Sequence, residues 1–327
     1  MVYHEIISSF QDKKVLIIGD VMIDSYIHGH ISRISPEAPV PVLNWAHREF
    51  RLGGAANVAL NIKSLGGMPV IATVIGNDEA GDQLISLFEK EDLVTKILVP
   101  SETRMTTMKT RIMAQHQHLL RIDEEDTDYL NMHEEQDLWT SIEHFMNETA
   151  PDAIIFQDYN KGVLTERIIK NTILLANKLN IPTAVDPKEK NFLSYAGVSL
   201  FKPNLKEIRT ASKLELKPEV EDLLKADKWL HEKLNHQSTM ITLSENGLYF
   251  GDGHAGKIYP TDTINITDVC GAGDTVIAIV ALCLAIGVNE EAMSKLANMA
   301  GGQVCQKSGV VPIDKAELLH EITEIFK

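Results

Sequence analysis

The octapeptide DVCGAGDT, residues 268–275, is the stretch that decides the fold, and an apolar run from Val276 to Ile286 follows it. Its two glycines let the backbone approach a ligand closely, and the apolar run predicts a helix whose first free N–H groups point back at the turn. Such a helix start attracts anions. A carboxylate at an anion site repels its ligand, so we interpret Asp274 as a base that takes a hydroxyl proton in a phosphoryl-transfer centre. The alternative is a capped core helix in which Asp274 is only an N-terminal charge.

Length and composition describe an ordinary globular chain. Its 327 residues suit one large α/β domain, and 44% of them are hydrophobic. The net charge of -15 argues against binding of nucleic acid or of an anionic membrane, because both need a positive surface. The N-terminus lacks a signal-peptide pattern, and the longest apolar run is too short to span a bilayer. Three cysteines without CxxC spacing argue against a disulfide framework or a zinc knuckle, so we expect a cytoplasmic protein.

The run KVLIIG at residues 14–19 predicts a buried parallel strand. Asp20 and Asp24 follow its carboxyl end. Because ligands in open α/β sheets bind beyond the carboxyl ends of the strands, we expect these acids to bind substrate hydroxyls. A solvated loop acid is the alternative for each. A second strand is predicted at 70–75 and an amphipathic helix at 78–90.

Two segments, about 25–50 and 104–122, have the alternating pattern of exposed β-strands. The first is too apolar for a linker and too rich in proline for a central strand. The second carries Lys109, Arg111 and Arg121. We pair the two segments as a small β lid outside the main sheet, with its basic residues facing an anionic substrate. Solvated strand charges are the alternative.

The segment RLGGAAN, residues 51–57, opens a predicted helix that runs to about Leu65. The pair Gly53 and Gly54 allows a ligand to lie against the backbone, and Asn57 lies one turn further on, within reach of that ligand. The alternative is close packing of the helix on the sheet.

From residue 133 onward helices and strands alternate, as in a doubly wound sheet. Helices are predicted at 133–148 and 165–180, and strands at 153–156, 183–185 and 199–201. Each strand ends in a polar cluster, at 158–162, 186–188 and 202–204, which suggests a common crevice. Asn204 and Glu207, three apart at a helix start, have the spacing to hold a metal or its waters beside phosphates. A capping pair is the alternative.

The segment GDGHAG, residues 251–256, formally matches a dinucleotide-binding fingerprint. That fingerprint must open a helix, whereas here a short apolar segment leads to Pro260, so we predict a hairpin turn after strands at 239–243 and 248–250. No P-loop motif occurs in the sequence. Two closing helices are predicted at 289–308 and 314–326.

The early GGAAN at 53–57 and the late GAGD at 271–274 together resemble the ribokinase-like (PfkB) sugar kinases, over essentially the whole chain. Within that family the stretches 33–42, 109–111, 120–123, 158–162 and 185–188 are similar to heptose 7-phosphate kinases. The resemblance implies an α/β, ribokinase-like doubly wound central β-sheet flanked by helices, with a small β lid. It also implies one kinase domain over residues 1–327, without the adenylyltransferase domain of bifunctional relatives.

The activity implied by the resemblance is transfer of phosphate from ATP, assisted by Mg²⁺, to the anomeric hydroxyl of a heptose 7-phosphate. That reaction belongs to the ADP-heptose route to the lipopolysaccharide core. A monovalent-cation requirement is left open. The partners implied are a sugar phosphate, ATP and a second copy of the chain, paired through the exposed lid edges.

The resemblance also assigns roles to individual residues. Asp274 is the base, with Gly271, Ala272 and Gly273 as the anion hole. The sugar contacts are Asp24, Gly53, Gly54, Asn57 and Asp158; the candidate cations for the sugar phosphate are Arg33, Lys109, Arg111, Lys161 and Lys188. The nucleotide contacts are Asn204, Ser244, Gly247, Gly271, Gly273, Asn298 and Gly309, and the metal ligands are Glu207 and Asn204.

Two other functions are compatible with the same motifs. One is a kinase of this fold that acts on another sugar, sugar phosphate or nucleoside. The other is a non-catalytic sugar-binding protein, which an intact Gly271–Asp274 motif disfavours because a pure binder has no use for a base there.

Overall fold

The computed structural model describes residues 3–115, 117–261, 267–307 and 309–325, and its described chain forms one nine-stranded and one four-stranded sheet. The large sheet has the strand order β13-β12-β11-β10-β9-β8-β1-β4-β5. Its strands from β11 to β5 pair in parallel, whereas β12 and β13 add antiparallel at one edge. The bounds are β1 Lys14–Gly19, β4 Met68–Gly76, β5 Val94–Ser101, β8 Ala153–Gln157, β9 Thr183–Asp186, β10 Leu200–Phe201, β11 Ser238–Thr242, β12 Leu248–Gly251 and β13 Gly256–Tyr259.

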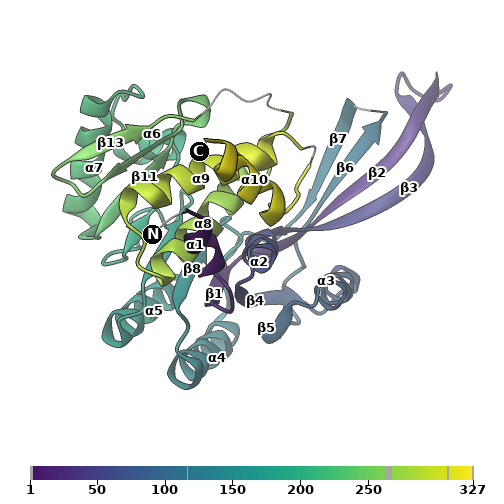
Figure 1. Ribbon diagram of the computed structural model, residues 1–327. Coiled ribbons are helices and arrows are strands. Elements are labelled where there is room, and N and C mark those ends of the chain that lie inside the picture. The colour runs from purple at the N-terminus through teal and green to yellow at the C-terminus, as the bar shows by residue number, and fades with distance from the viewer. Residues whose placement is uncertain (1–2, 116, 262–266, 308, 326–327) are drawn as a thin grey trace.

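Helices cover both faces of this sheet, which confirms the doubly wound arrangement (Figure 1). Apolar residues of α1, α2, α3, α8, α9 and α10 form one core, and those of α4, α5, α6 and α7 form the other. Because both faces are covered, β1 is apolar and buried almost throughout, as its sequence predicts. The bounds are α1 Tyr3–Ser8, α2 Ala55–Ser64, α3 Glu79–Lys90, α4 Met132–Thr149, α5 Glu166–Leu179, α6 Leu205–Ser212, α7 Val220–Leu234, η1 Ser244–Asn246, α8 Ala272–Ala285, α9 Glu290–Cys305 and α10 Lys315–Ile325.

Helix α8 is the central helix that the apolar run predicts. Its residues from Asp274 to Cys283 are all buried, because it packs between the sheet, α2 and α9. A helix that is apolar on all sides needs such surroundings. The helix begins two residues before Asp274, so this carboxylate lies in its first turn.

The four-stranded sheet is the lid, and in Figure 1 it extends away from the body of the molecule. Its order is β3-β2-β6-β7, from the strands β2 Val21–Ile34, β3 Pro41–Gly54, β6 Met108–Ala114 and β7 Gln117–Glu124. The first segment is longer than the predicted 25–50. Strand β2 starts one residue after β1, and β3 continues through residues 51–54, which the sequence assigned to a helix start.

The two faces of the lid differ in polarity because side chains alternate along each strand. Asp24 pairs with Lys109, and Lys109 pairs with Asp123, so these three share one face. The next pairs on that face are Tyr26 with Arg111 and Arg111 with Arg121. The opposite face is richer in apolar residues: Ile27, Ile112 and Leu120 form one of its rows, which Arg48 completes on β3.

Two further predictions concern the chain as a whole. The segment GDGHAG joins β12 to β13 in an antiparallel pair with Gly251 opposite Gly256, which confirms the hairpin. Among the helices of the described residues, none is both long and apolar enough to cross a membrane.

Candidate active site

Asp274 occupies the first turn of α8, and only 4% of the residue is exposed. Three side chains donate hydrogen bonds to its carboxylate: Asn57 Nδ2 at 2.7 Å, Gln157 Nε2 at 2.9 Å and the Tyr159 hydroxyl at 2.7 Å. These donors come from α2 and from the end of β8. Burial raises the pKa of Asp274 to about 6, against the lowering effect of the bonds from Asn57 and Tyr159. The group is therefore held in place and titrates close to neutral pH.

The turn before Asp274 leaves the start of α8 open. Gly271 has φ of 82°, a left-handed conformation that suits glycine, and no side chain of the described residues caps the helix there. Ala272 N makes only a long contact of 3.4 Å with the Val269 carbonyl oxygen, so the start of α8 has the donors that an anion site needs. A Cβ on Gly273 would lie 3.5 Å from Asp186 Oδ2 and 3.9 Å from Lys202 Nζ. The absence of a side chain at Gly273 leaves this space beside Asp186 and Lys202 open to a ligand.

A buried ion pair lies beside that turn. Lys202 Nζ is 3.0 Å from Asp186 Oδ1, and the two residues are 2% and 7% exposed. Lys202 follows β10, and Asp186 is the last residue of β9. Both lie at strand ends where the sequence places polar clusters. The sequence reasoning did not select either residue, nor Gln157 and Tyr159, as site residues. Their signals were their place at a strand end and, for Tyr159 and Asp186, their place in stretches similar to the heptose 7-phosphate kinases.

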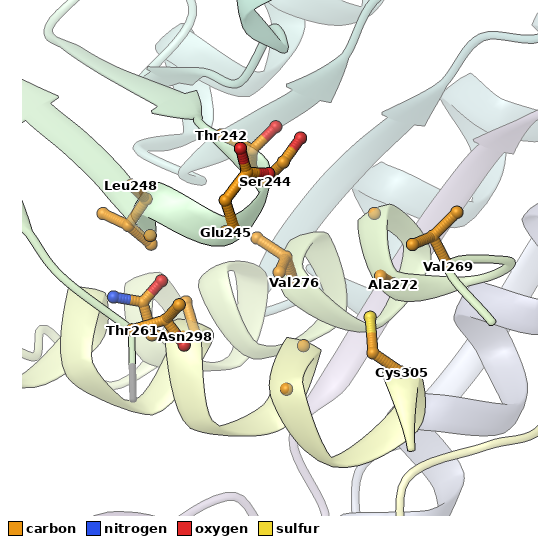
Figure 2. Close-up of a pocket in the computed structure, with 15 residues that line it drawn as sticks. Thr242, Ser244, Glu245, Leu248, Thr261, Val269, Ala272, Val276, Asn298 and Cys305 are labelled. Carbon is orange, nitrogen blue, oxygen red and sulfur yellow. The ribbon is translucent and has the colours of Figure 1, made fainter. Parts of the chain in front are cut away.

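A cavity of about 470 Å³ opens on the other side of the α8 turn (Figure 2). Its size is within the usual range for small-molecule sites. Ser244 and Gly247 line it from the connection between β11 and β12, and Asn298 lines it from α9; these are three of the residues proposed from sequence as nucleotide contacts. Ala272 and Gly273 also line it, so the cavity reaches the turn that precedes Asp274.

On the lid side, Asp24 lies next to the glycine pair. A Cβ on Gly53 would be 2.4 Å from Asp24 Oδ2, and one on Gly54 would be 2.4 Å from the Asp20 carbonyl oxygen. These contacts support the close-packing interpretation of the glycines. They also bring Asp24 close to the start of α2, where Asn57 lies in the first turn. Arg111 forms an ion pair with the Asp24 carboxylate.

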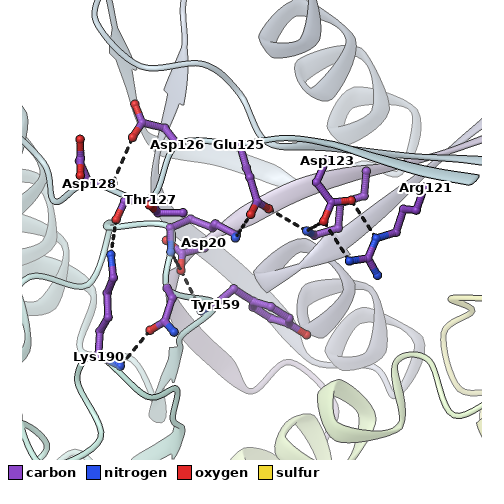
Figure 3. Close-up of polar contacts among 12 residues, drawn as sticks. Asp20, Arg121, Asp123, Glu125, Asp126, Thr127, Asp128, Tyr159 and Lys190 are labelled. Atoms are coloured by element: carbon purple, nitrogen blue, oxygen red, sulfur yellow. Dashed lines mark hydrogen bonds and ion pairs between the residues drawn. The ribbon is translucent and has the colours of Figure 1, made fainter.

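Two of the candidate cations converge on a single carboxylate (Figure 3). Lys109 Nζ is 2.8 Å from Glu125 Oε2, and Lys161 Nζ is 2.7 Å from Glu125 Oε1. Lys109 also pairs with Asp123 at 3.1 Å. Lys161 belongs to the loop after β8, whereas Lys109 belongs to the lid. Lid and body therefore place two ammonium groups around one anion.

Arg33 and Lys188 do not join this group. Arg33 lies nine residues beyond Asp24 on β2, and a rise of about 3.3 Å per residue puts it about 30 Å along the strand. Lys188 pairs with Glu207, and nearby Asp186 and Glu207 keep the pKa of Lys188 above its ordinary value, although burial opposes this. Lys188 therefore lies near Asp186, Glu207 and Asp274 rather than near Glu125.

Asp158, a predicted substrate contact, has hydrogen-bond partners within the protein on both carboxylate oxygens. Asp158 accepts from Asn160 N at 2.8 Å, from Asn191 Nδ2 at 3.0 Å and from the Tyr195 hydroxyl at 2.8 Å. Asp20 is likewise buried and accepts three backbone N–H bonds from residues 159–163. It therefore holds the loop that carries Tyr159 and Lys161, rather than lying solvated or free for a ligand.

Asn204 and Glu207 form the capping box that was the alternative interpretation. Glu207 N donates to Asn204 Oδ1 and Asn204 N donates to Glu207 Oε2, both at 2.8 Å. Since Lys188 pairs with Glu207 Oε1, both oxygens of this carboxylate have partners. Direct ligation of a metal would have to displace one of them.

Gly309 does not line the cavity. Its N–H donates to Asp268 Oδ2 at 3.0 Å, and a Cβ there would lie 2.6 Å from Arg51 Nη1. The structure therefore places Gly309 between the 268–270 turn and the root of the lid.

Solved structures share this fold. Phosphofructokinase-2 from Escherichia coli, in complex with potassium, superposes with a TM-score of 0.78 at 19% identity, over 97% of this chain and 100% of that one. Ribokinase from Arabidopsis thaliana, complexed with ribose and ATP, gives a TM-score of 0.73 at 14% identity, over 95% and 99%. The chain has the ribokinase-like α/β fold.

The chain belongs to the pfkB family of carbohydrate kinases, whose family model matches residues 12–316. These enzymes transfer a phosphate to an alcohol. The bifunctional protein HldE of Campylobacter jejuni subsp. doylei is 42% identical over 312 residues, 95% of this chain. HldE of Sulfurimonas denitrificans is 37% identical over 319 residues, 96% of this chain. The chain spans 65% of the length of each of these two relatives.

Proposed function

We propose that the chain phosphorylates the anomeric O1 of D-glycero-β-D-manno-heptose 7-phosphate with ATP, giving the 1,7-bisphosphate used for ADP-heptose and the lipopolysaccharide core. The observation that carries the proposal is the buried Asp274 carboxylate, fixed by three donors between the cavity and the polar face of the lid. The choice of a heptose rests on the motifs shared with heptose 7-phosphate kinases and on the HldE relatives.

In this mechanism Asp274 accepts the proton of the sugar hydroxyl as that oxygen attacks the γ-phosphate of ATP. The N–H groups at the start of α8 hold the migrating phosphate, and Lys188 and Lys202 offset its charge. The base must be deprotonated to act, which a pKa near 6 allows at neutral pH. The lid excludes water that would otherwise hydrolyse ATP.

The nucleotide occupies the cavity next to Gly273, with Ser244, Gly247 and Asn298 around it. Mg²⁺ prefers oxygen ligands and keeps several waters beside phosphates. Asp186 fits this need, because the described partner of its Oδ2 is Gln157 Nε2 at a long 3.5 Å. Glu207 fits through waters, since both its oxygens are engaged. When bound, the metal neutralises phosphate charge.

The 7-phosphate of the sugar replaces Glu125 between Lys109 and Lys161. A carboxylate held by two ammonium groups marks a place where an anion is already stabilised. A sugar without a distal phosphate would leave Glu125 in place and gain nothing from the two lysines. The pair thus provides selection for a phosphorylated sugar.

The test is ADP release with ATP and Mg²⁺ against heptose 7-phosphate, fructose 6-phosphate, ribose and adenosine. We expect turnover confined to the heptose phosphate. Turnover with another acceptor would refute the substrate and keep the kinase. No ADP release with any of the four acceptors would favour a non-catalytic sugar-binding protein.

Asp274→Asn tests the base separately. We expect it to lower kcat by roughly 10²- to 10⁴-fold while ATP still binds, because only the proton acceptor is lost. Asp252→Asn, the same change at an exposed residue of the β12–β13 hairpin, is the matched control and should leave kcat unchanged. Near-normal turnover of Asp274→Asn would remove this residue from the role of base.

A further inference from the structure

A second cluster of ligand-type side chains lies away from Asp274. Asp227 and His231 are one turn apart on α7, and His236 follows the end of that helix. Each offers one ligand atom, and the three atoms lie within 4.8 Å of one another. It is the one such group of three among the residues that the structure describes. His236 precedes β11, whereas the cavity meets that strand at its other end, at Thr242.

Each of the three side chains has one atom held by the protein. Asp227 Oδ2 accepts from Gly253 N at 2.9 Å and from the Tyr249 hydroxyl at 3.1 Å. His231 Nδ1 lies 3.0 Å from the carbonyl oxygen of Asp227, which can only accept, so the contact needs the proton on Nδ1. His236 Nε2 is 2.6 Å from Thr239 Oγ1.

Two imidazole nitrogens of the cluster, His231 Nε2 and His236 Nδ1, are buried and lack a hydrogen-bond partner in the described chain. Asp227 Oδ1 also accepts no hydrogen bond there, but it lies 3.0 Å from His231 Nδ1 in an ion-pair contact. Asp227 is fully buried and His236 is 5% exposed, so water does not readily satisfy these atoms. An unsatisfied buried polar atom costs about 1–3 kcal/mol, and two such nitrogens beside a buried carboxylate point to a missing ligand.

The arrangement matches that of metal-binding histidines. A ligating imidazole usually donates its other N–H to a carbonyl or another acceptor, which fixes its orientation and leaves one lone pair free. Two imidazoles and a carboxylate suit Zn²⁺ and similar transition metals, whereas Mg²⁺ prefers oxygen ligands throughout. We propose that Asp227, His231 and His236 bind one divalent transition-metal ion, with Zn²⁺ as the best-suited metal.

The site ties α7 to the β12–β13 hairpin. Gly253 of the hairpin donates to Asp227, and a Cβ on Gly253 would lie 2.6 Å from His231 Cγ, so hairpin and ring are in close contact. The side chain of His231 is 19% exposed, which gives the ion a path from solvent. Since the cluster is not part of the proposed kinase site, bound metal stabilises the fold here rather than taking part in phosphoryl transfer.

The test uses the full chain, stripped with a chelator and kept free of nucleotide so that no phosphate-dependent metal site forms. Calorimetric titration with ZnCl₂ is expected to show one equivalent per chain, and Co²⁺ is expected to give the strong visible absorption of a four-coordinate ion. Zn²⁺ should also raise the melting temperature by a few degrees, because it binds only the folded state.

His231→Gln and His236→Gln are each expected to weaken Zn²⁺ binding at least 10-fold and to abolish the Co²⁺ absorption. His254→Gln, at an exposed histidine of the same hairpin, is the matched control and should bind as the unmodified chain does. If the unmodified chain does not bind Zn²⁺, the proposal is wrong, and an interior water is then the simpler partner for these atoms. Full binding by both histidine variants would also overturn it.

Discussion

At the scale of single residues, the catalytic proposal depends on an acid that the fold buries. Burial favours the neutral form of Asp274, while hydrogen bonds from Asn57 and Tyr159 favour the charged form. The outcome is a pKa near 6, high enough to accept a proton well and low enough to be deprotonated at neutral pH.

This balance predicts the pH dependence of the reaction. Because the base is lost as pH falls through its pKa, kcat/KM should drop about tenfold per pH unit below about 6. Tyr159→Phe removes a donor that lowers the pKa, so its profile should shift to higher pH. The pH profiles of kcat/KM for both proteins are obtained from initial rates at saturating ATP between pH 5 and 8.5.

Tyr129→Phe is the control, because its hydroxyl donates to Asn191 and not to Asp274. Its midpoint should equal that of the unmodified chain. Burial and the Asp158 charge also raise the pKa of Asp20 to about 6. A midpoint unmoved by Tyr159→Phe would therefore assign the ionisation to another group such as Asp20.

Single residues were predicted best from sequence where they belong to a motif. Asp274 and Asn57 each belong to one, and in the structure they form a hydrogen bond. Gln157 and Lys202 lie in no motif, and only the pairing of β8, β9 and β10 brings them near α8. The partners of Asp158 were not predictable, because the sequence does not show that Asn191 and Tyr195 return to it.

At the scale of elements, the strands of the parallel sheet were the most predictable feature. Their apolar, β-branched runs are buried on both faces, and this pattern is visible in the sequence. The lid bounds were less predictable, because β2 continues directly from β1 and carries no turn signal at the boundary. Strand β5 and helix α7 were not predicted: β5 is half exposed and α7 is largely polar.

The element-scale prediction concerns the lysines that meet at Glu125. Lys161→Gln should raise KM for a phosphorylated sugar about 10- to 100-fold, the worth of one charge-assisted hydrogen bond, with little change in kcat. KM for a non-phosphorylated acceptor should be unchanged. Steady-state kinetics with both acceptors provide the measurement.

Arg121→Gln is the matched control for this change. Arg121 lies on the same lid face but is exposed and pairs with Asp123 alone among the described carboxylates. Arg121→Gln should leave KM for both acceptors equal to that of the unmodified chain. An equal rise for the two acceptors in Lys161→Gln would show that Lys161 does not recognise the phosphate.

At the scale of the whole molecule, the lid face that carries Ile27, Ile112 and Leu120 has large apolar side chains that the described part of the chain leaves exposed. Leu120 is 56% exposed and Ile122 is 44% exposed on β7, and Trp45, opposite Gly29 on the same face, is 68% exposed. Large exposed apolar patches usually mark an interface. We propose that a second copy of the chain covers this face; the sequence suggested a dimer through the lid edges instead.

The double change Leu120→Glu with Ile122→Glu should therefore convert a dimer into a monomer. Light scattering coupled to gel filtration should give twice 36.4 kDa for the unmodified chain and 36.4 kDa for the variant. Leu174→Glu, at a 60% exposed leucine of α5, is the control and should stay dimeric. A monomeric mass for the unmodified chain at micromolar concentration would refute the dimer.

The way the lid joins the body has a mechanical consequence. Only Asp20 separates β1 from β2, β3 passes into α2 without a loop, and Ala55 N donates to the Asp20 carbonyl at 2.9 Å. Because neither of these two connections contains a loop, we infer that β2, a strand of about 45 Å, transmits any tilt of the lid to Asp20. Asp20 accepts a hydrogen bond from Tyr159 N, and the Tyr159 hydroxyl donates to Asp274. A lid movement that releases product would therefore also shift Tyr159 and weaken its hydrogen bond to the base.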